Sequence, residues 1–410
     1  MRSGAWLTAS RLRGYSLIFI GFYVIAIAVW IALSHGLIDP NGKPIGTDFS
    51  NVYAAGTLIW RGAAADAYSP ALQHAAEVAV FGRDVPFYGW HYPPFFFVVA
   101  VTVAAVPYAW GLSGWVLASL AAYLAAIRAI LPRPETMLVA LAFPAVFVNA
   151  GHGNNGFLTA ALLGGALHLL DRKPGLAGLL IGLLIYKPQF GILIPLALLA
   201  GRRWTAIGTA ALTIAALIVI SMATLGIGVW RAFMASTAFT RTVVLEQGNT
   251  GWEKIQSVFS ATRMWGANLH VAYGAQIALA LLLAVSIAWL WRSKAAFELK
   301  ASALATASLL ATPYVLDYDL TVLAVAIAFF VRHGLERGFH GGEITMLMAA
   351  WVMPLLTRSI AGATGIPLGL IVMLTLYTFT LRRAACDLHE MSGASADSRR
   401  CDAELRTSPT

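Results

Sequence analysis

Long apolar runs are the feature that most limits what this chain can fold into. They recur from near the N-terminus almost to residue 383, and short loops that contain arginine or lysine separate them. Only 11% of the 410 residues are charged and 59% are hydrophobic, whereas roughly a quarter of the residues of a soluble domain are charged. The runs are continuous and do not alternate, which predicts membrane-spanning α-helices and argues against a β-barrel.

The runs predict an all-α polytopic membrane protein with about twelve spans and both termini in the cytoplasm. They lie at 15–35, 93–110, 114–131, 137–150, 157–170, 175–186, 189–200, 204–226, 273–291, 300–316, 318–331, 343–357 and 366–381. If the run 93–110 lies at the interface and does not cross, the Arg/Lys clusters between the runs fall on the cytoplasmic side, as the positive-inside rule expects. Pro93, Pro94 and Pro107 also suit a broken interfacial segment.

Charge and cysteine content exclude several classes. The net charge is +9, but the basic residues sit between apolar runs, so they set topology and do not indicate a nucleic-acid partner. Cys386 and Cys401 lie at or after the last run, so neither a disulfide framework nor a metal-thiolate site is expected. The first run has no small-residue cleavage site, which predicts an uncleaved first helix.

The polar segments define the domain organisation. We expect one transmembrane domain over 1–383, with outer segments at 36–92 and 227–272 that can carry amphipathic helices. The polar stretch 384–410 is expected to be a disordered cytoplasmic tail. An inner (plasma) membrane location with membrane lipids as surroundings follows from this topology.

Asp48 and Lys187 are the charged residues whose positions most need an explanation. Asp48 comes soon after the first run, where partial desolvation suits a carboxylate to general-base chemistry; alternatively it caps a helix that starts near Ser50. Lys187 joins the half-length runs 175–186 and 189–200. A lysine at membrane depth is costly and usually has a function, so we expect it to bind an anion such as a lipid phosphate. The alternative is that its side chain snorkels to the interface.

Polar side chains also gather at two proline- and glycine-rich turns. His91 and Tyr92 precede Pro93, which favours an extended backbone and directs them either into a cavity or into an interfacial aromatic belt. A second turn, after the run 137–150, contains Asn149, His152, Asn154 and Asn155. Four such groups exceed what a connection requires, although a solvated turn is the alternative; Asn154 and Asn155 are the predicted substrate contacts.

Three later segments supply the remaining candidates. Asp317 and Asp319 could bind a sugar hydroxyl or a cation, but two acids are too few for most metal sites, so no metal is predicted. Gln256 lies in a polar outer stretch with a tryptophan, which suits carbohydrate or headgroup contact or a plain amphipathic helix. Arg358 breaks the positive-inside trend, which suggests a buried acid or a phosphate as its partner.

Taken in order, these residues resemble glycosyltransferase family 87, in the C-type glycosyltransferase superfamily, over roughly residues 15–383. The resemblance rests on Asp48 after the first span, Tyr53, Gly62 and Tyr68, Tyr92-Pro93-Pro94, Gly153-Asn154-Asn155, Lys187-Pro188, Arg202-Arg203-Trp204, Gln256-Ser257 and Thr312-Pro313. Members include mycobacterial polyprenol-phosphate-mannose-dependent mannosyltransferases. The resemblance therefore implies a C-type fold and transfer of a hexose, often mannose, from a polyprenyl-phosphate donor to a lipid or glycan acceptor on the outer face.

The resemblance also implies roles for particular residues. It assigns the catalytic base to Asp48 and the carrier phosphate to Lys187. In the mechanism that follows, Arg358 or His91 would help Lys187 to stabilise the negative charge that grows on the leaving phosphate. Some members carry a histidine near the turn after the Thr/Ser-Pro, where this chain has Asp317 and Asp319, so the sugar stays open. No cofactor is expected, because a lipid-linked donor needs no nucleotide-binding loop, and a single base without a second nucleophilic acid suits inversion at the anomeric carbon.

Two other classes remain open at this level. A transporter or flippase could use Lys187, Asp317 and Asp319 as substrate or proton sites, although the longest polar segments lie on one side and no repeat is evident. A catalytically inactive homologue that assists assembly is the other alternative. Transport without covalent change identifies the first, and a phenotype that survives Asp48→Asn identifies the second.

Overall fold

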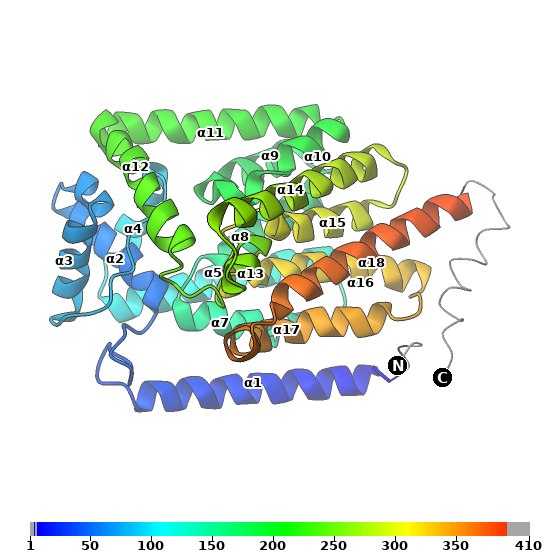
Figure 1. Cartoon of the computed structure of the whole chain (residues 1–410), viewed down its shortest axis with the longest axis horizontal. Helices are drawn as coiled ribbons and strands as arrows, with labels where there is room; N and C mark the ends of the chain where they lie inside the picture. Colours follow the sequence, from blue (N-terminus) through cyan, green and yellow to red (C-terminus); the bar gives the residue numbers. More distant parts are fainter. Residues whose placement is uncertain (1–3, 5, 392–410) are drawn as a thin grey trace.

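The regular elements of the described chain, which is residue 4 and residues 6–391 of a computed structural model, are all helices. Most of them run along the long direction of one bundle (Figure 1). The first turn of α1 (Ala9–Ala32) and the last turn of α18 (Leu368–Met391) lie at the same end of this bundle. The predicted all-α fold is confirmed.

Seven helices of the described part are long and apolar enough to cross a membrane. Besides α1 and α18 they are α5 (Tyr108–Ile130), α11 (Trp204–Leu225), α14 (Leu269–Arg292), η6 (Asp317–Val322) continued by α16 (Leu323–Arg337), and α17 (Glu343–Thr364). They contain 21–24 residues, and such helices rise about 30 Å or more, the thickness of the hydrocarbon core. The protein is therefore a multi-pass membrane protein.

The other apolar helices are shorter. They are η2 (Pro94–Phe96) with α4 (Phe97–Val103), α6 (Thr136–Leu141), α7 (Pro144–His152), α8 (Gly156–Leu169), α9 (Pro174–Leu183) with η3 (Leu184–Tyr186), and η4 (Pro188–Gly191) with α10 (Ile194–Ala200). The predicted run 93–110 is two segments, because α4 ends at Val103 and α5 begins after Pro107. Ten residues rise only about 15 Å, so such a segment does not cross alone, and the count of about twelve spans stays a prediction.

Small residues allow the central helices to pack closely. Helix α15 (Phe297–Leu310) is buried on almost every side and is rich in alanine and serine, as expected for a helix enclosed by others. Gly178 and Gly182 of α9 face α11, where a Cβ at either position would collide with Ala206 or Thr213. This small-xxx-small spacing is the usual way for membrane helices to approach closely.

The two polar segments lie away from the end where α1 begins: the first is at the opposite end, and the second extends from that end to near the middle of the bundle (Figure 1). The first contributes α2 (Thr47–Trp60), η1 (Ala64–Tyr68) and α3 (Pro70–Phe81); the second contributes α12 (Ile227–Phe239), the π-helical turn η5 (Thr240–Glu246) and α13 (Val258–Met264). They pack on each other, with the rings of Tyr68 and Phe233 5.6 Å apart.

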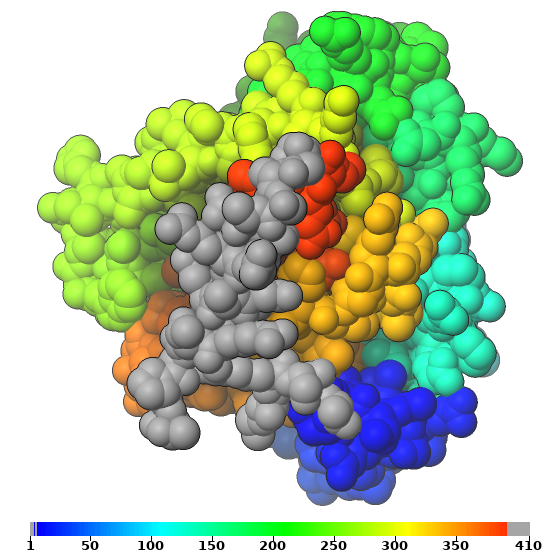
Figure 2. All heavy atoms as spheres, turned by 90° about the vertical axis from the view of Figure 1, so that its right-hand side faces the viewer, coloured from blue at the N-terminus to red at the C-terminus, as the bar shows by residue number. Residues whose placement is uncertain are grey.

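Basic loops gather at the end where α1 begins. The connections from α10 to α11 and from α14 to α15 lie there (Figure 1) and carry Arg202, Arg203 and Lys294, and α16 ends there at Arg337. Figure 2 looks onto this end and shows the last turns of α18 among the neighbouring helices. The arrangement separates the two polar segments from the basic loops, as one topology for the whole bundle requires.

The predicted disordered tail begins too early. Helix α18 continues to Met391, so residues 384–391 are helical, while the rest of the predicted tail lies outside the described residues. The physical reason is a buried ion network: Arg383 contacts Glu343 at 3.1 Å and Asp387 at 2.9 Å, and His333 contacts Asp387 at 2.9 Å. These pairs hold the last turns against α16 and α17.

Candidate active site

Asp48 lies in the first turn of α2. The helix begins after Gly46, whose φ of 74° is accessible to glycine at little cost, and Tyr108 donates a hydrogen bond to the Gly46 carbonyl at 3.2 Å. The helix begins at Thr47 with no side-chain cap, so the alternative in which Asp48 caps a helix starting near Ser50 is wrong. The Asp48 side chain is 14% exposed, so its carboxylate is partly desolvated but reachable.

Asn154 joins Asp48 to Lys187. Its Nδ2 donates to Asp48 Oδ2 at 3.2 Å, and its Oδ1 accepts from Lys187 Nζ at 3.4 Å. An ammonium can only donate and a carboxylate can only accept, so these neighbours fix which way the amide points. The structure thus brings together the predicted base Asp48 and the predicted cation Lys187, which lie far apart in the chain.

Lys187 is buried and already paired. Its side chain is 6% exposed, and Nζ lies 2.6 Å from Asp319 Oδ1. The second oxygen of Asp319 accepts the backbone N–H of Leu316 at 3.0 Å. An ammonium at this depth does not snorkel to the interface; it forms a neutral pair with the acid that precedes α16.

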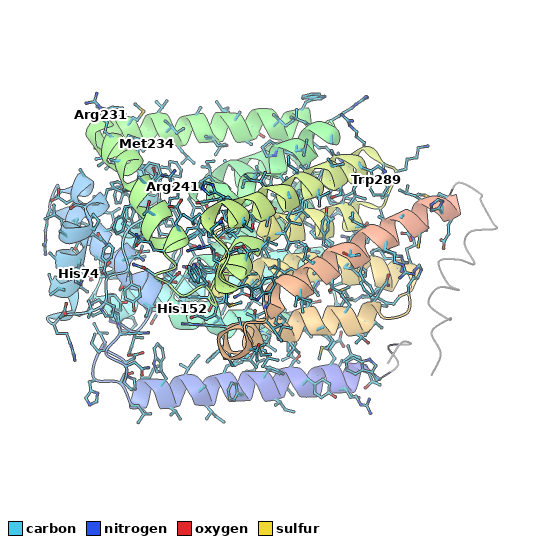
Figure 3. The ribbon with its side chains drawn as sticks, in the orientation of Figure 1. His74, His152, Arg231, Met234, Arg241 and Trp289 are labelled. Atoms are coloured by element: carbon cyan, nitrogen blue, oxygen red, sulfur yellow. The ribbon has the colours of Figure 1, made fainter. Side chains whose placement is uncertain are left out.

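His152 is the nearest titratable neighbour of Asp48. Its Nδ1 is 2.6 Å from Thr47 Oγ1 and 4.0 Å from Asp48 Oδ2. Burial lowers the pKa of His152, and although Asp48 opposes this shift, the ring stays neutral at neutral pH. The 4.0 Å contact is therefore not an ion pair, and the carboxylate of Asp48 accepts one hydrogen bond, from Asn154, among the described side chains. In Figure 3, His152 lies between the helices of the first polar segment and the middle of the bundle.

His91 and Tyr92 lie in the loop that connects α3 to η2. His91 Nδ1 lies 2.8 Å from Thr240 Oγ1 in the π-helical turn, which ties the first outer segment to the second. Burial lowers the pKa of His91 to about 4, so it is neutral at pH 7. The loop before it is held by buried Glu77, whose carboxylate accepts the backbone N–H of Gly89 at 3.1 Å.

Asn155 presents an unpaired polar atom. Its side chain is 3% exposed, and its Oδ1 has no hydrogen-bond partner among the described residues. Its backbone carbonyl accepts Tyr186 at 3.2 Å, and the Tyr186 ring lies 6.3 Å from that of Tyr92. A buried polar atom without a partner is costly, which makes Asn155 a candidate contact for a polar ligand.

Two more cations, Lys254 and Arg358, lie near Tyr318 and the acid before it. Lys254 Nζ is 5.1 Å from the centre of the Tyr318 ring, and Lys187 Nζ is 5.5 Å from it. Arg358 is 48% exposed, and its guanidinium lies 3.9 Å from Asp317 Oδ2. The expectation that Arg358 pairs with a buried acid agrees with this contact, since the Asp317 side chain is 4% exposed.

Gln256 is used internally. Its Oε1 accepts Thr357 Oγ1 at 2.5 Å, and its Nε2 donates to the carbonyls of Glu253 and Lys254 at 2.9 and 3.2 Å. All its hydrogen-bonding atoms are therefore engaged, and the residue ties the outer loop to α17. Its predicted contact with substrate stays a prediction, since the structure contains no ligand.

The sequence reasoning did not single out two residues that the structure places at the site. Tyr318 lies between the two candidate acids Asp317 and Asp319, and a tyrosine in this position gives no signal of its own beside two charged residues. Lys254 lies two positions before Gln256 in a polar loop, and a loop lysine carries no signal of its own. The backbone pairing of Gln256 N–H with the Val315 carbonyl, at 2.8 Å, is what brings the two segments together.

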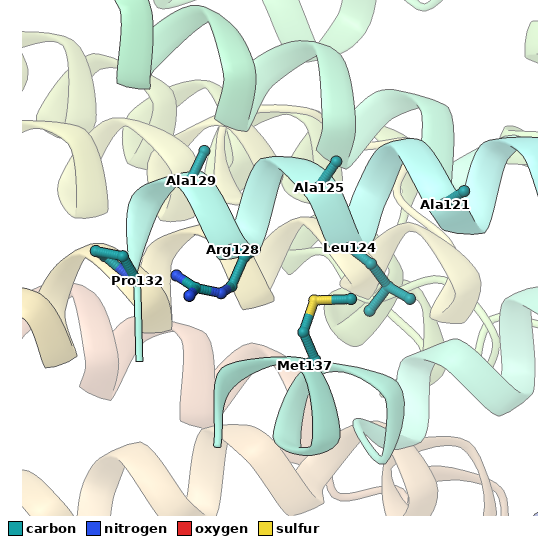
Figure 4. Close-up of a pocket in the computed structure, with 7 residues that line it drawn as sticks. All are labelled: Ala121, Leu124, Ala125, Arg128, Ala129, Pro132 and Met137. Atoms are coloured by element: carbon teal, nitrogen blue, oxygen red, sulfur yellow. The ribbon is translucent and has the colours of Figure 1, made fainter. Parts of the chain in front are cut away.

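A surface groove of about 660 Å³ lies away from these residues. It is lined by Ala121, Leu124, Ala125, Arg128, Ala129, Pro132 and Met137 (Figure 4). The groove is at the C-terminal end of α5, whereas the N-terminal residue Tyr108 of this helix contacts the start of α2. The groove is therefore distinct from the site around Asp48.

Comparison with known sequences identifies the family. No curated protein and no solved structure matches the chain. Residues 90–313 match glycosyltransferase family 87, and this range covers more than half of the chain and includes His91, Asn154 and Lys187. The chain, a multi-pass membrane protein, therefore belongs to glycosyltransferase family 87 and is a membrane glycosyltransferase.

Proposed function

We propose that this protein transfers a hexose from a polyprenyl-phosphate carrier to a lipid or glycan acceptor, and that the hexose is mannose. The observation that carries the proposal is the carboxylate of Asp48, which is partly exposed, faces a neutral histidine and is oriented by one asparagine. That arrangement leaves lone pairs of a carboxylate available to an incoming hydroxyl.

The reaction needs one base and a stabilised leaving group. As the acceptor hydroxyl attacks the anomeric carbon, its proton passes to Asp48. The bond from the anomeric carbon to the phosphate oxygen breaks on the opposite face, and polyprenyl phosphate leaves with the electron pair. Attack and departure on opposite faces invert the configuration of the anomeric carbon. The proposed reaction is a single displacement without a covalent intermediate on a second carboxylate, so the inverted configuration is kept in the product.

Cations near Asp48 would stabilise the charge that grows on the leaving phosphate. Lys187 and Arg358 are the groups proposed from the sequence, and Lys254 lies in the same region. His91 is neutral at pH 7, so it would act as a hydrogen-bond donor or acceptor and not as a charge. Asn155, Tyr92 and Asp317 are proposed to contact the sugar.

The proposed topology puts this chemistry on the outer face of the inner (plasma) membrane. Its support is the separation in Figure 1 between the end that carries the polar segments and the end that carries the basic loops. Lys/Arg-rich loops remain in the cytoplasm as a rule. Both termini would then be cytoplasmic, because α1 begins and α18 ends among the basic loops.

The function is tested with purified protein in liposomes. Radiolabelled polyprenyl-phosphate mannose and an extract of membrane lipids should give a labelled product, whereas a nucleotide-linked mannose should give none. Label that appears across the bilayer in unchanged donor would instead indicate a flippase. Transfer from the nucleotide-linked sugar, with none from the lipid-linked one, would contradict the proposed donor.

A further inference from the structure

The charge of Lys187 is already compensated. Its ammonium and the carboxylate of Asp319 are 2.6 Å apart, and both side chains are almost fully buried. A phosphate brought to this ammonium would lie beside a carboxylate of the same sign, and like charges in a buried site repel strongly. The geometry therefore favours orientation of Asn154 as the task of Lys187, and not the phosphate binding that was predicted from the sequence.

Lys254 is a cation without such a partner. In the described part of the chain it forms no salt bridge, and its ammonium lies over the Tyr318 ring at 5.1 Å from the ring centre. The lysine is partly buried. A cation–π contact holds an ammonium in place without neutralising its charge, so Lys254 keeps a full positive charge for an anion.

Arg358 supplies a second cation, whose pairing with Asp317 is loose. Its side chain is 48% exposed, and its contact with Asp317 is long, at 3.9 Å. A guanidinium presents several N–H donors in a plane, and a phosphate oxygen pair matches this pattern better than one distant carboxylate oxygen does. The His152 ring lies 5.6 Å from the Tyr318 ring that Lys254 covers, and Arg358 contacts Asp317, the residue before Tyr318. Both cations are therefore near the histidine beside Asp48.

The fold fixes Lys254 and Arg358 with respect to each other. Buried Gln256 donates to the Lys254 carbonyl at 3.2 Å and accepts from Thr357, the neighbour of Arg358, at 2.5 Å. The Gln256 N–H also donates to the Val315 carbonyl at 2.8 Å. One side chain therefore ties the loop that carries Lys254 to α17, so the backbone positions of the two cations are fixed with respect to each other.

We propose that Lys254 and Arg358, and not Lys187, bind the phosphate of the lipid-linked donor. The proposal rests on the proposed function, since it names the residues that hold the donor of that reaction. Lys187 is then a positioning residue, which orients Asn154 toward Asp48. The ligand class is a phosphate ester that carries a long polyprenyl chain.

The test is equilibrium binding of polyprenyl phosphate to the full chain in nanodiscs of neutral lipid, with unphosphorylated polyprenol as the reference ligand. Lys254→Gln and Arg358→Gln should each weaken binding at least about tenfold, the scale of one charge-assisted hydrogen bond. Lys254→Arg should retain it. Lys43→Gln is the matched control, because Lys43 is an exposed lysine of the first outer segment and its loss should leave binding unchanged.

Each result has a distinct meaning. If Lys254→Gln and Arg358→Gln both bind polyprenyl phosphate with wild-type affinity, and a Lys187→Gln variant that stays folded loses this binding, the inference is overturned. The proposed donor is unaffected by that result. Equal affinity of wild-type protein for polyprenyl phosphate and polyprenol would overturn the proposed donor as well. Displacement of polyprenyl phosphate by equimolar inorganic phosphate would show a site for free phosphate, which also contradicts the assignment.

Discussion

Replacing Lys187 by methionine should destabilise the protein markedly. The substitution keeps most of the side-chain volume but removes the ammonium 2.6 Å from Asp319 Oδ1. Asp319 is 1% exposed, and among the described residues it would keep only the backbone N–H of Leu316 as a donor. Loss of one partner from a buried ion pair costs about 3–5 kcal/mol, whereas replacing both by apolar groups is often neutral. The double variant Lys187→Met/Asp319→Leu should therefore recover most of the lost stability.

The assay is unfolding of purified protein in one detergent, compared between wild type, each single variant and the double variant. The coupling energy between the two positions should be several kcal/mol and of the sign that makes the double variant more stable than the sum of the singles. A Lys187→Met protein as stable as wild type would refute the reasoning. So would a double variant no more stable than Lys187→Met alone.

Two further predictions test the packing and the pH response of the site. Gly156→Ala should lower the yield of folded protein, because a Cβ there would collide with Asn149 Oδ1 and the Tyr318 carbonyl. Gly274 has open space around it, so Gly274→Ala should leave the yield unchanged. Equal yields of the two variants would contradict this contact. Stability should fall as the pH drops from 6.5 toward 4. Burial lowers the pKa of His91 to about 4, so in this range the unfolded chain binds a proton at His91 that the folded chain does not bind. His91→Gln should flatten that slope in pH-dependent unfolding, and an unchanged slope would exclude His91 as its source.

Much of the fold could be predicted from the apolar runs. The run 204–226 corresponds to α11 and the run 273–291 to α14, because continuous apolar stretches of this length have no other stable structure in a membrane. Helix ends were harder to predict where ion pairs extend a helix. Helix α18 outlasts its apolar run because Arg383 and Asp387 find partners on neighbouring helices, and such partners are visible only in three dimensions.

The site could be predicted in part. Asp48 and Lys187 stood out because a charge beside or between membrane helices is costly and needs a reason. Their link through Asn154 could not be predicted, since it depends on how α2 meets the turn after α7. The pairing of Lys187 with Asp319 was hidden for the same reason: each residue looked like a ligand contact while its partner was unknown. Lys254 gave no signal, because a lysine in an outer loop is ordinary.

Single-turnover transfer by the Asp48→Asn variant tests the central claim most directly. Asparagine keeps the size of the side chain but does not act as a base, so the rate from pre-bound polyprenyl-phosphate mannose should fall by about 10²–10⁴-fold. Binding of the donor should stay as in wild type. Transfer at the wild-type rate by Asp48→Asn would contradict the role of this carboxylate as the base.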